Sequence, residues 1–289
     1  MIPQITVIIP FKNEGEEVDN TLRSITEKAE GSINIILIND NSDDNYDYCQ
    51  IANKYNALYV ANQSSLGVAP SREIGIALCK TEYFLILDAH MRSFTQNWDK
   101  LLCDYLINDH RSIFCFTTLD IKKNGEVRTQ KKGYGVTLNL NNLSYNWICQ
   151  DLELNNIKSS YVIPCIMGGA YASNIEYWNR INGLKGLNGF GFDEQLISLK
   201  TFFEGGNCKV ITDIEFGHIF REYKDVPYNI DHSEVIYNQL YITELLFPLS
   251  EKISFFHQLK TASNKMFFDK AIDKIIDRSG GINHEKEYM

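Results

Sequence analysis

Cysteines spaced for local pairing are missing from this sequence of 289 residues. Its seven cysteines are an odd number, and none belongs to a Cys-x-x-Cys pair. We therefore predict neither a disulfide framework nor a zinc site, because both depend on suitably spaced cysteines. A reducing compartment, the cytoplasm, is the expected location.

An excess of basic residues is also missing. The formal net charge is -9 at pH 7, and the pI is about 5.2. Nucleic-acid binding needs a basic face that releases counterions from phosphates, so this class of partner is excluded. Any phosphate-bearing ligand must be bound by a few local groups.

Long apolar runs are missing too. No stretch reaches the roughly 20 residues that a membrane-spanning helix needs. The apolar run within residues 1–11 has only the length of a strand and follows no basic segment. We expect neither a signal peptide nor a transmembrane segment, and a protein that is soluble or peripheral at a membrane.

Apolar and aromatic residues are present in the proportions of a folded protein. The hydrophobic fraction is 44%, with 16 Tyr and 16 Phe. Such a chain has enough apolar surface to build a core. Its length predicts one large domain at 1–230 and an appended segment at 231–289, where apolar stripes at helical spacing predict helices.

Strand and helix patterns alternate over the first ninety residues. This order predicts an α/β fold with a doubly wound, mostly parallel central sheet flanked by helices, whose ligands lie beyond the carboxyl ends of the strands. The predicted strands are 5–10, 33–38, 58–60 and 83–87, and the predicted helices are 15–30, 47–55 and 69–80.

Polar residues follow two of these strands. Asp88 and His90 come directly after strand 83–87 and can reach one divalent ion, and mixed oxygen and nitrogen ligands suit Mn²⁺ better than Ca²⁺. Asp40 follows strand 33–38, where its carboxylate can accept the imide N–H of a uracil. The ordinary alternative for both sites is an aspartate that caps a turn.

Two further residues can serve either chemistry or structure. Arg72, on the helix after Gly67, can donate to a phosphate or to a neighbouring acid, although a helix-surface salt bridge is commoner. His218 stands between Phe216 and Phe220, where a histidine is more often structural than a metal ligand.

Taken together, four stretches resemble the catalytic domain of the polypeptide N-acetylgalactosaminyltransferases, which are retaining GT-A enzymes, and more distantly the family 2 glycosyltransferases. They span residues 5 to about 230 in the order of that domain. The stretches are Phe11-Lys12-Asn13-Glu14, 84–90 (FLILDAH) with Trp98, Met167-Gly168-Gly169-Ala170-Tyr171 with Tyr177-Trp178, and Gly217-His218-Ile219-Phe220-Arg221 with Pro227-Tyr228.

This resemblance implies a GT-A fold and a Mn²⁺ site formed by Asp88, His90 and the distant His218. It also implies that the diphosphate of a UDP-sugar donor completes the ligand shell of the ion and that Asp40 holds the uracil. Pro10, Phe11 and Lys12 would line the nucleotide, Arg72, Arg221 and Tyr228 would bind the diphosphate side, and Ala89, Gly168 and Gly169 would complete the donor site. The nucleotide-binding half would be about 1–110 and the acceptor-side half 111–230.

The stretch 189–195 aligns with the Trp-Gly-Gly-Glu-Asn segment of the same family. Phe190 falls at the tryptophan that covers the leaving group, and Asp193 and Glu194 fall at the Glu-Asn pair, although acids at a helix start are also ordinary dipole partners. One arginine of the family is Pro70 here. Donor specificity is therefore not inherited.

The expected reaction is Mn²⁺-dependent transfer of a hexose or N-acetylhexosamine from a UDP-sugar, with retention and with Arg221 stabilising the leaving group. The alternatives are an inverting, family 2-like transferase with Asp193 or Glu194 as base, and a nucleotide-sugar-binding protein without catalysis. A nucleotidyltransferase is disfavoured, because it would need a basic Gly-rich loop near the N-terminus, and residues 11–17 are not such a loop.

The acceptor side is less defined. A glycan, a protein and a lipid-linked sugar all stay open as acceptors. The C-terminal helices would pack onto the catalytic domain by default, with a homo-oligomer interface or a membrane surface as the other roles.

Overall fold

Buried apolar runs form the strands of one mixed sheet in this computed structural model, which describes residues 4–151 and 160–286. Strand β1 (Ile5–Phe11) is buried along its whole length and pairs in parallel with β2 (Asn34–Asn39) and β4 (Tyr83–Leu87). β3 (Leu58–Ala61) continues in parallel beside β2. The doubly wound half that the sequence predicts is confirmed, with the strand order β3-β2-β1-β4.

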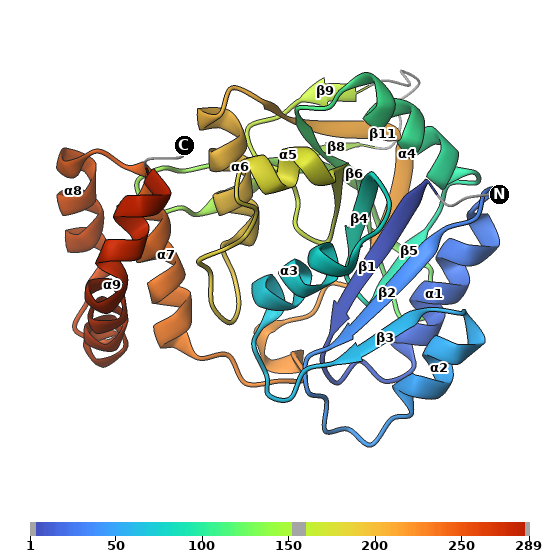
Figure 1. Cartoon of the computed structure of the whole chain (residues 1–289), viewed down its shortest axis with the longest axis horizontal. Helices are drawn as coiled ribbons and strands as arrows, with labels where there is room; N and C mark the ends of the chain where they lie inside the picture. The colour runs from blue at the N-terminus through green and yellow to red at the C-terminus, as the bar shows by residue number, and fades with distance from the viewer. Residues whose placement is uncertain (1–3, 152–159, 287–289) are drawn as a thin grey trace.

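Most strand pairs in the other half of the sheet are antiparallel. β10 (Ala170–Asn174) pairs antiparallel with β4 and with β6 (Ser112–Ile121). β11 (Asn207–His218) is parallel to β6 and antiparallel to the short β5 (Met91–Ser93). The α/β class is therefore confirmed, while the complete sheet is mixed (Figure 1). Three further strands pair outside the main path of the sheet: β7 (Val127–Leu138) pairs with β6 and with β8 (Tyr145–Asp151), and β9 (Ser160–Val162) pairs with β11.

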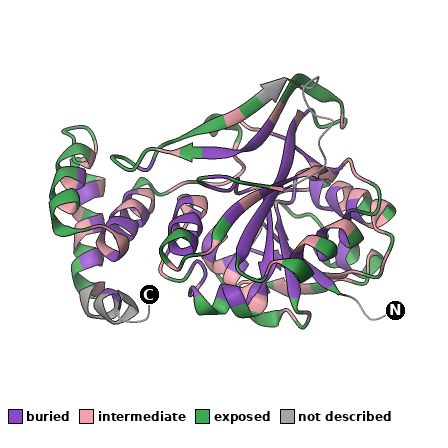
Figure 2. Cartoon of the chain, turned by 90° about the horizontal axis from the view of Figure 1, so that it is seen from above, coloured by how far each residue is buried: buried purple, intermediate pink, exposed green. Residues whose placement is uncertain are grey.

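Helices cover both faces of the sheet, because alternate residues of a strand point to opposite sides. Val7 of β1 belongs to a buried cluster with Leu22, whereas Ile8 belongs to another with Ile76. Figure 2 shows the buried residues gathered in the central strands and on the helix faces toward them. The helices of the large domain are α1 (Glu17–Lys28), α2 (Tyr48–Lys54), α3 (Val68–Leu78), α4 (Trp98–Asn108), α5 (Ile175–Arg180), α6 (Asp193–Phe203) and the 3-10 turn η2 (Tyr223–Asp225).

The C-terminal extension consists of α7 (His232–Leu246), α8 (Leu249–Leu259) and α9 (Lys265–Lys286), beside α6 at one end of the molecule (Figure 1). Leu240, Phe255 and Phe268 of these helices share a buried cluster with Leu196 of α6. The extension thus packs onto the large domain, as expected by default. Its boundary at residue 230 stays a prediction. None of the described helices is long and apolar enough to cross a membrane.

Candidate functional site

The turn after β4 brings a carboxylate and two imidazoles together. Asp88 directly follows the strand, and its backbone N–H donates to the carbonyl of Gly169 at 2.8 Å. β5 follows at once and pairs with β11 so that His218 lies opposite Met91, and the N–H of Ile219 donates to the carbonyl of His90 at 3.2 Å. Sheet pairing therefore places His218 beside a motif 128 residues earlier in the chain, counted from His90 to His218.

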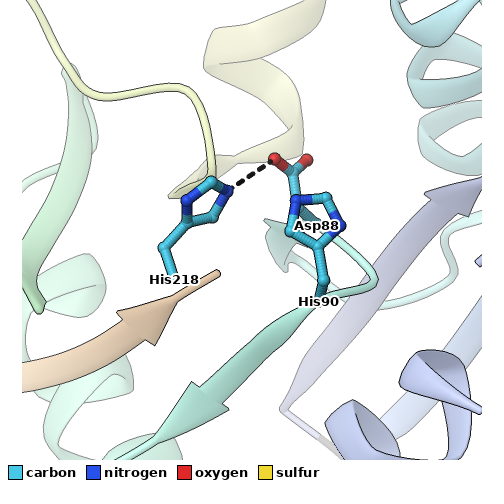
Figure 3. Close-up of side chains that lie close together, drawn as sticks. All are labelled: Asp88, His90 and His218. Atoms are coloured by element: carbon cyan, nitrogen blue, oxygen red, sulfur yellow. Dashed lines mark ion pairs between the residues drawn. The ribbon is translucent and has the colours of Figure 1, made fainter. Parts of the chain in front are cut away.

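Asp88, His90 and His218 offer ligand atoms that all lie within 4.8 Å of one another. Figure 3 shows the imidazole of His218 facing the carboxylate of Asp88, with Nε2 and Oδ2 3.6 Å apart. Metal–ligand bonds of about 2.1 Å hold neighbouring ligand atoms roughly 3 Å apart, so the three side chains are close to the geometry of a shared ion. This donor set of one carboxylate and two imidazoles suits a divalent transition-metal ion.

The charge state of these groups also suits a cation. Burial alone would raise the pKa of Asp88, but the nearby imidazole of His218 and the positive charge of Arg72 lower it overall. Burial lowers the pKa of His218, and the neighbouring His90 and Arg221 act in the same direction against the nearby carboxylate of Asp88. An ionised carboxylate and a neutral imidazole are the forms that bind a metal ion.

Glu14 is a site residue to which the sequence analysis assigned no role. Its buried carboxylate accepts from Nη1 of Arg221 at 2.8 Å, forms a second contact with Nη2, and lies 3.3 Å from Nδ1 of His90. Burial raises its pKa, yet the hydrogen bonds from His90 and Arg221 bring the net value down to about 2. The signal in the sequence was its place in the loop after the first strand.

Arg72 links Asp88 to the start of α6. Its guanidinium is 3% exposed, donates through Nη2 to Asp88 Oδ1 at 2.8 Å and to the carbonyl of Gly168 at 3.1 Å, and pairs with Asp193. The arginine predicted to face a diphosphate is thus engaged by two carboxylates, neither of which lies on an exposed helix surface. Its role toward a ligand stays a prediction.

Glu194 follows Asp193 and approaches the Gly168-Gly169 turn. A Cβ atom on Gly168 would lie 2.0 Å from Oε1 of Glu194, so glycine is required for this approach. Burial raises the pKa of Glu194, with a smaller opposing effect from Arg72. Its carboxyl group is therefore easier to protonate than an exposed one.

Asp40 has many partners within the protein. Oδ1 accepts from the N–H of Leu66 at 2.7 Å and from Nδ2 of Asn62 at 2.8 Å, while Oδ2 accepts from Ser65 and from the N–H of Gly67. This carboxylate therefore anchors the start of α3. The contact between Asp40 and uracil stays a prediction. The imide N–H of the uracil would have to share a carboxylate oxygen that already accepts these hydrogen bonds.

The cleft around these groups has a volume of about 1190 Å³. Every residue that the sequence analysis assigned to the site lines it. Besides the residues described above, the lining includes Pro10, Phe11, Lys12, Ala89, Gly169, Phe190 and Tyr228. The ring centroids of Phe190 and Tyr228 lie 6.3 Å apart, so the two rings form one wall.

An aromatic wall on the other side was not predicted. Tyr145 and Trp147 of β8 line the cleft and are 49% and 37% exposed. The ring centroid of Trp147 is 5.2 Å from that of Phe220, which in turn is 4.2 Å from His218. Their alternation along a strand was the available signal, because residues two apart share a face.

Comparison with solved structures defines the class of the fold. GalNAc-T7, solved with UDP, GalNAc and Mn²⁺, matches 96% of this chain with a TM-score of 0.72 at 17% identity, over 57% of its own length. TarS 1–349 of S. aureus, solved with UDP-GlcNAc, matches 94% with a TM-score of 0.58 at 13% identity, over 80% of its length. The protein has the GT-A fold of glycosyltransferases.

Sequence comparison then gives the family. The family model described as "Glycosyl transferase family 2" matches residues 6–172, more than half of the chain, so the protein belongs to that family. Polypeptide N-acetylgalactosaminyltransferase 10 of Homo sapiens is 23% identical over 247 residues, or 79% of this chain. Polypeptide N-acetylgalactosaminyltransferase 8 of Drosophila melanogaster is 25% identical over 240 residues, or 76%. The chain spans 39% of the length of each.

Proposed function

We propose that this glycosyltransferase moves a hexose or N-acetylhexosamine from a UDP-sugar to a hydroxyl acceptor on a glycan, a protein or a lipid-linked sugar, with Mn²⁺ held by Asp88, His90 and His218. The observation that carries the proposal is the convergence of three metal-binding groups from two distant segments within 4.8 Å. The presence of UDP and Mn²⁺ in GalNAc-T7 supports the choice of both ligands.

The bound ion would offset the negative charge that develops on the β-phosphate as the glycosidic bond breaks. Arg72 orients the carboxylate of Asp88 through the 2.8 Å hydrogen bond. A carboxylate oxygen of Glu14 lies 3.3 Å from Nδ1 of His90, where it would direct Nε2 toward the ligand side. Arg221 lines the cleft beside this pair and would face the leaving diphosphate.

The two acids of α6 have different surroundings. Asp193 is buried and committed to Arg72, so it orients the site rather than removing a proton. Glu194 lines the cleft, and burial raises its pKa. In the retaining reaction that we propose, the departing phosphate takes the acceptor proton and Glu194 orients the sugar.

The second candidate is an inverting reaction in which Glu194 is the general base. Its raised pKa favours this role over Asp193, because a base with a pKa nearer neutrality transfers protons more effectively. The anomeric configuration of the first-formed product, read by proton NMR, separates the two reactions.

The metal assignment is tested with Asp88→Ala and His218→Ala. Both variants should lose Mn²⁺-dependent UDP binding in calorimetry and lose transfer, whereas Asp213→Ala, on the same strand as His218 and outside the cleft, should keep both. Wild-type turnover in either test variant would overturn the site. Tight UDP binding with neither transfer nor donor hydrolysis in the wild type would instead indicate the non-catalytic binding protein.

We also propose a cytoplasmic location, which the seven free cysteines support. Pairing of copies through the C-terminal helices stays a prediction, and sedimentation of the full chain tests it.

A further inference from the structure

The segment between α5 and α6 carries Phe190 and leads into Asp193, and it has glycine at positions 183, 186, 189 and 191. It approaches α3 so closely that a Cβ atom on Gly67 would lie 2.3 Å from Cα of Gly189. The N–H of Val68 donates to the carbonyl of Gly189 at 2.9 Å. Such a glycine-rich path depends on other parts of the chain to fix its conformation.

Asn238 of α7 binds this segment through its whole carboxamide group. Nδ2 donates to the carbonyl of Asn188 at 2.7 Å and to that of Gly191 at 2.9 Å, and Oδ1 accepts from the N–H of Asn188 at 2.9 Å. The side chain is fully buried. Its hydrogen bonds lie on both sides of Phe190 and so fix the backbone that carries this ring.

Arg278 of α9 and two tyrosines of α7 hold the preceding turn. Nη1 of Arg278 donates to the carbonyl of Gly186 at 2.8 Å and to the hydroxyl of Tyr237 at 2.7 Å. The hydroxyl of Tyr241 donates to the carbonyl of Lys185 at 3.1 Å. Thus α7 and α9 carry no residue that was predicted to bind the metal or the donor, although the start of α7 lines the cleft. They nevertheless hold the loop that carries Phe190.

We propose that Asn238 and Arg278 are positioning residues for transfer: the C-terminal extension completes the active site by fixing the loop 185–191 against the donor. This inference rests on the proposed function. The two residues act through Phe190 and Asp193 and touch no reacting atom. The three proposed metal ligands lie in the turn between β4 and β5 and at the end of β11, so none of them is part of the loop.

The test compares Asn238→Ala with Phe255→Leu, a change in the buried core of the same extension at a side chain that cannot hydrogen-bond to the loop. Asn238→Ala should lower kcat roughly 10- to 100-fold, as a misplacement near 1 Å does. Its affinity for Mn²⁺ should stay within about twofold of wild type. Amide hydrogen exchange in peptides covering 185–191 should become faster in Asn238→Ala and stay unchanged in Phe255→Leu, at a matched loss of melting temperature.

Arg278 supplies a second arm in case Asn238→Ala does not fold. Arg278→Lys keeps a donor for the carbonyl of Gly186 and should restore much of the kcat that Arg278→Met loses. Wild-type kcat and wild-type exchange in folded Asn238→Ala, or equal losses in Phe255→Leu, would overturn the inference. A wild-type chain without transfer would overturn the proposed function alone, because the exchange measurement still reports on the loop.

Discussion

The carboxylate of Glu14 offers a sharp test of how the proposed metal site is held. It lies 3.3 Å from Nδ1 of His90 and accepts hydrogen bonds from both terminal nitrogens of Arg221, whose side chain is 17% exposed. A carboxylate behind a metal-binding histidine fixes the orientation of the ring and raises its basicity. We therefore expect Glu14→Gln to weaken Mn²⁺ binding roughly 10- to 100-fold.

The same substitution should also destabilise the fold. Removing one partner of a buried ion pair leaves the other charge uncompensated, at a cost of about 3 kcal/mol. Glu17→Gln is the matched control, because Glu17 forms a comparably buried pair with Arg92 at 2.5 Å, with side chains 6% and 12% exposed, and does not line the cleft. The two variants should lose similar stability, and Glu14→Gln alone should lose metal affinity.

The assay is a titration of Mn²⁺ followed by electron paramagnetic resonance, with urea unfolding of the same samples. The unfolding free energy of each variant is compared with its Mn²⁺ affinity, because a general loss of stability must be distinguished from a local effect on the metal site. Wild-type affinity in Glu14→Gln would refute the reasoning. An equal loss of affinity in Glu17→Gln would refute it as well.

Two further predictions concern aspartates with many partners. Asp40→Asn should lower the unfolding free energy by about 2 kcal/mol, because the N–H groups of Leu66 and Gly67 lose a charged acceptor. If the variant instead binds UDP more weakly at unchanged stability, Asp40 acts on the uracil alone. Asp231→Ala should lower the unfolding free energy by about 1 kcal/mol at pH 7, because this residue caps α7 by accepting from the N–H of Ser233 at 2.8 Å. Burial raises the pKa of Asp231, but the hydrogen bonds from Ser233 and Lys270 together lower it from 3.8 to about 2. The stability difference from wild type should therefore persist above about pH 4 and vanish toward pH 2 in urea unfolding.

The parallel half of the fold was predictable because its signals are local. A continuous apolar run such as that of β1 indicates a strand buried on both faces. Asp88 could be recognised as a candidate because it is the first polar residue after such a run. The antiparallel half was harder, because the direction in which β10 enters the sheet depends on the excursion through β7 and β8. No local pattern fixes a pairing over that distance.

The same distinction separates the site residues. The neighbours of His218 in the sequence favoured a structural role for this histidine. Only the resemblance to a family connected it with Asp88, because the two residues are far apart in the sequence. Glu14 and Asn238 were harder still, because each acts through another residue, and a positioning residue carries no chemistry of its own to mark it. Their partners, His90 and the loop at Phe190, become visible only in three dimensions.

The charge balance of the cleft explains why a cation belongs in it. Arg72 and Arg221 are each engaged by carboxylates of the protein, and further acids line the walls. Lys12 also lines the cleft, but one ammonium group does not balance a diphosphate that carries at least two negative charges. Like charges in a partly buried cleft repel strongly, because solvent screens them poorly there. Since the chain as a whole is also acidic at -9, a UDP-sugar would gain little from long-range attraction, and the proposed divalent ion at Asp88 would supply the compensating charge.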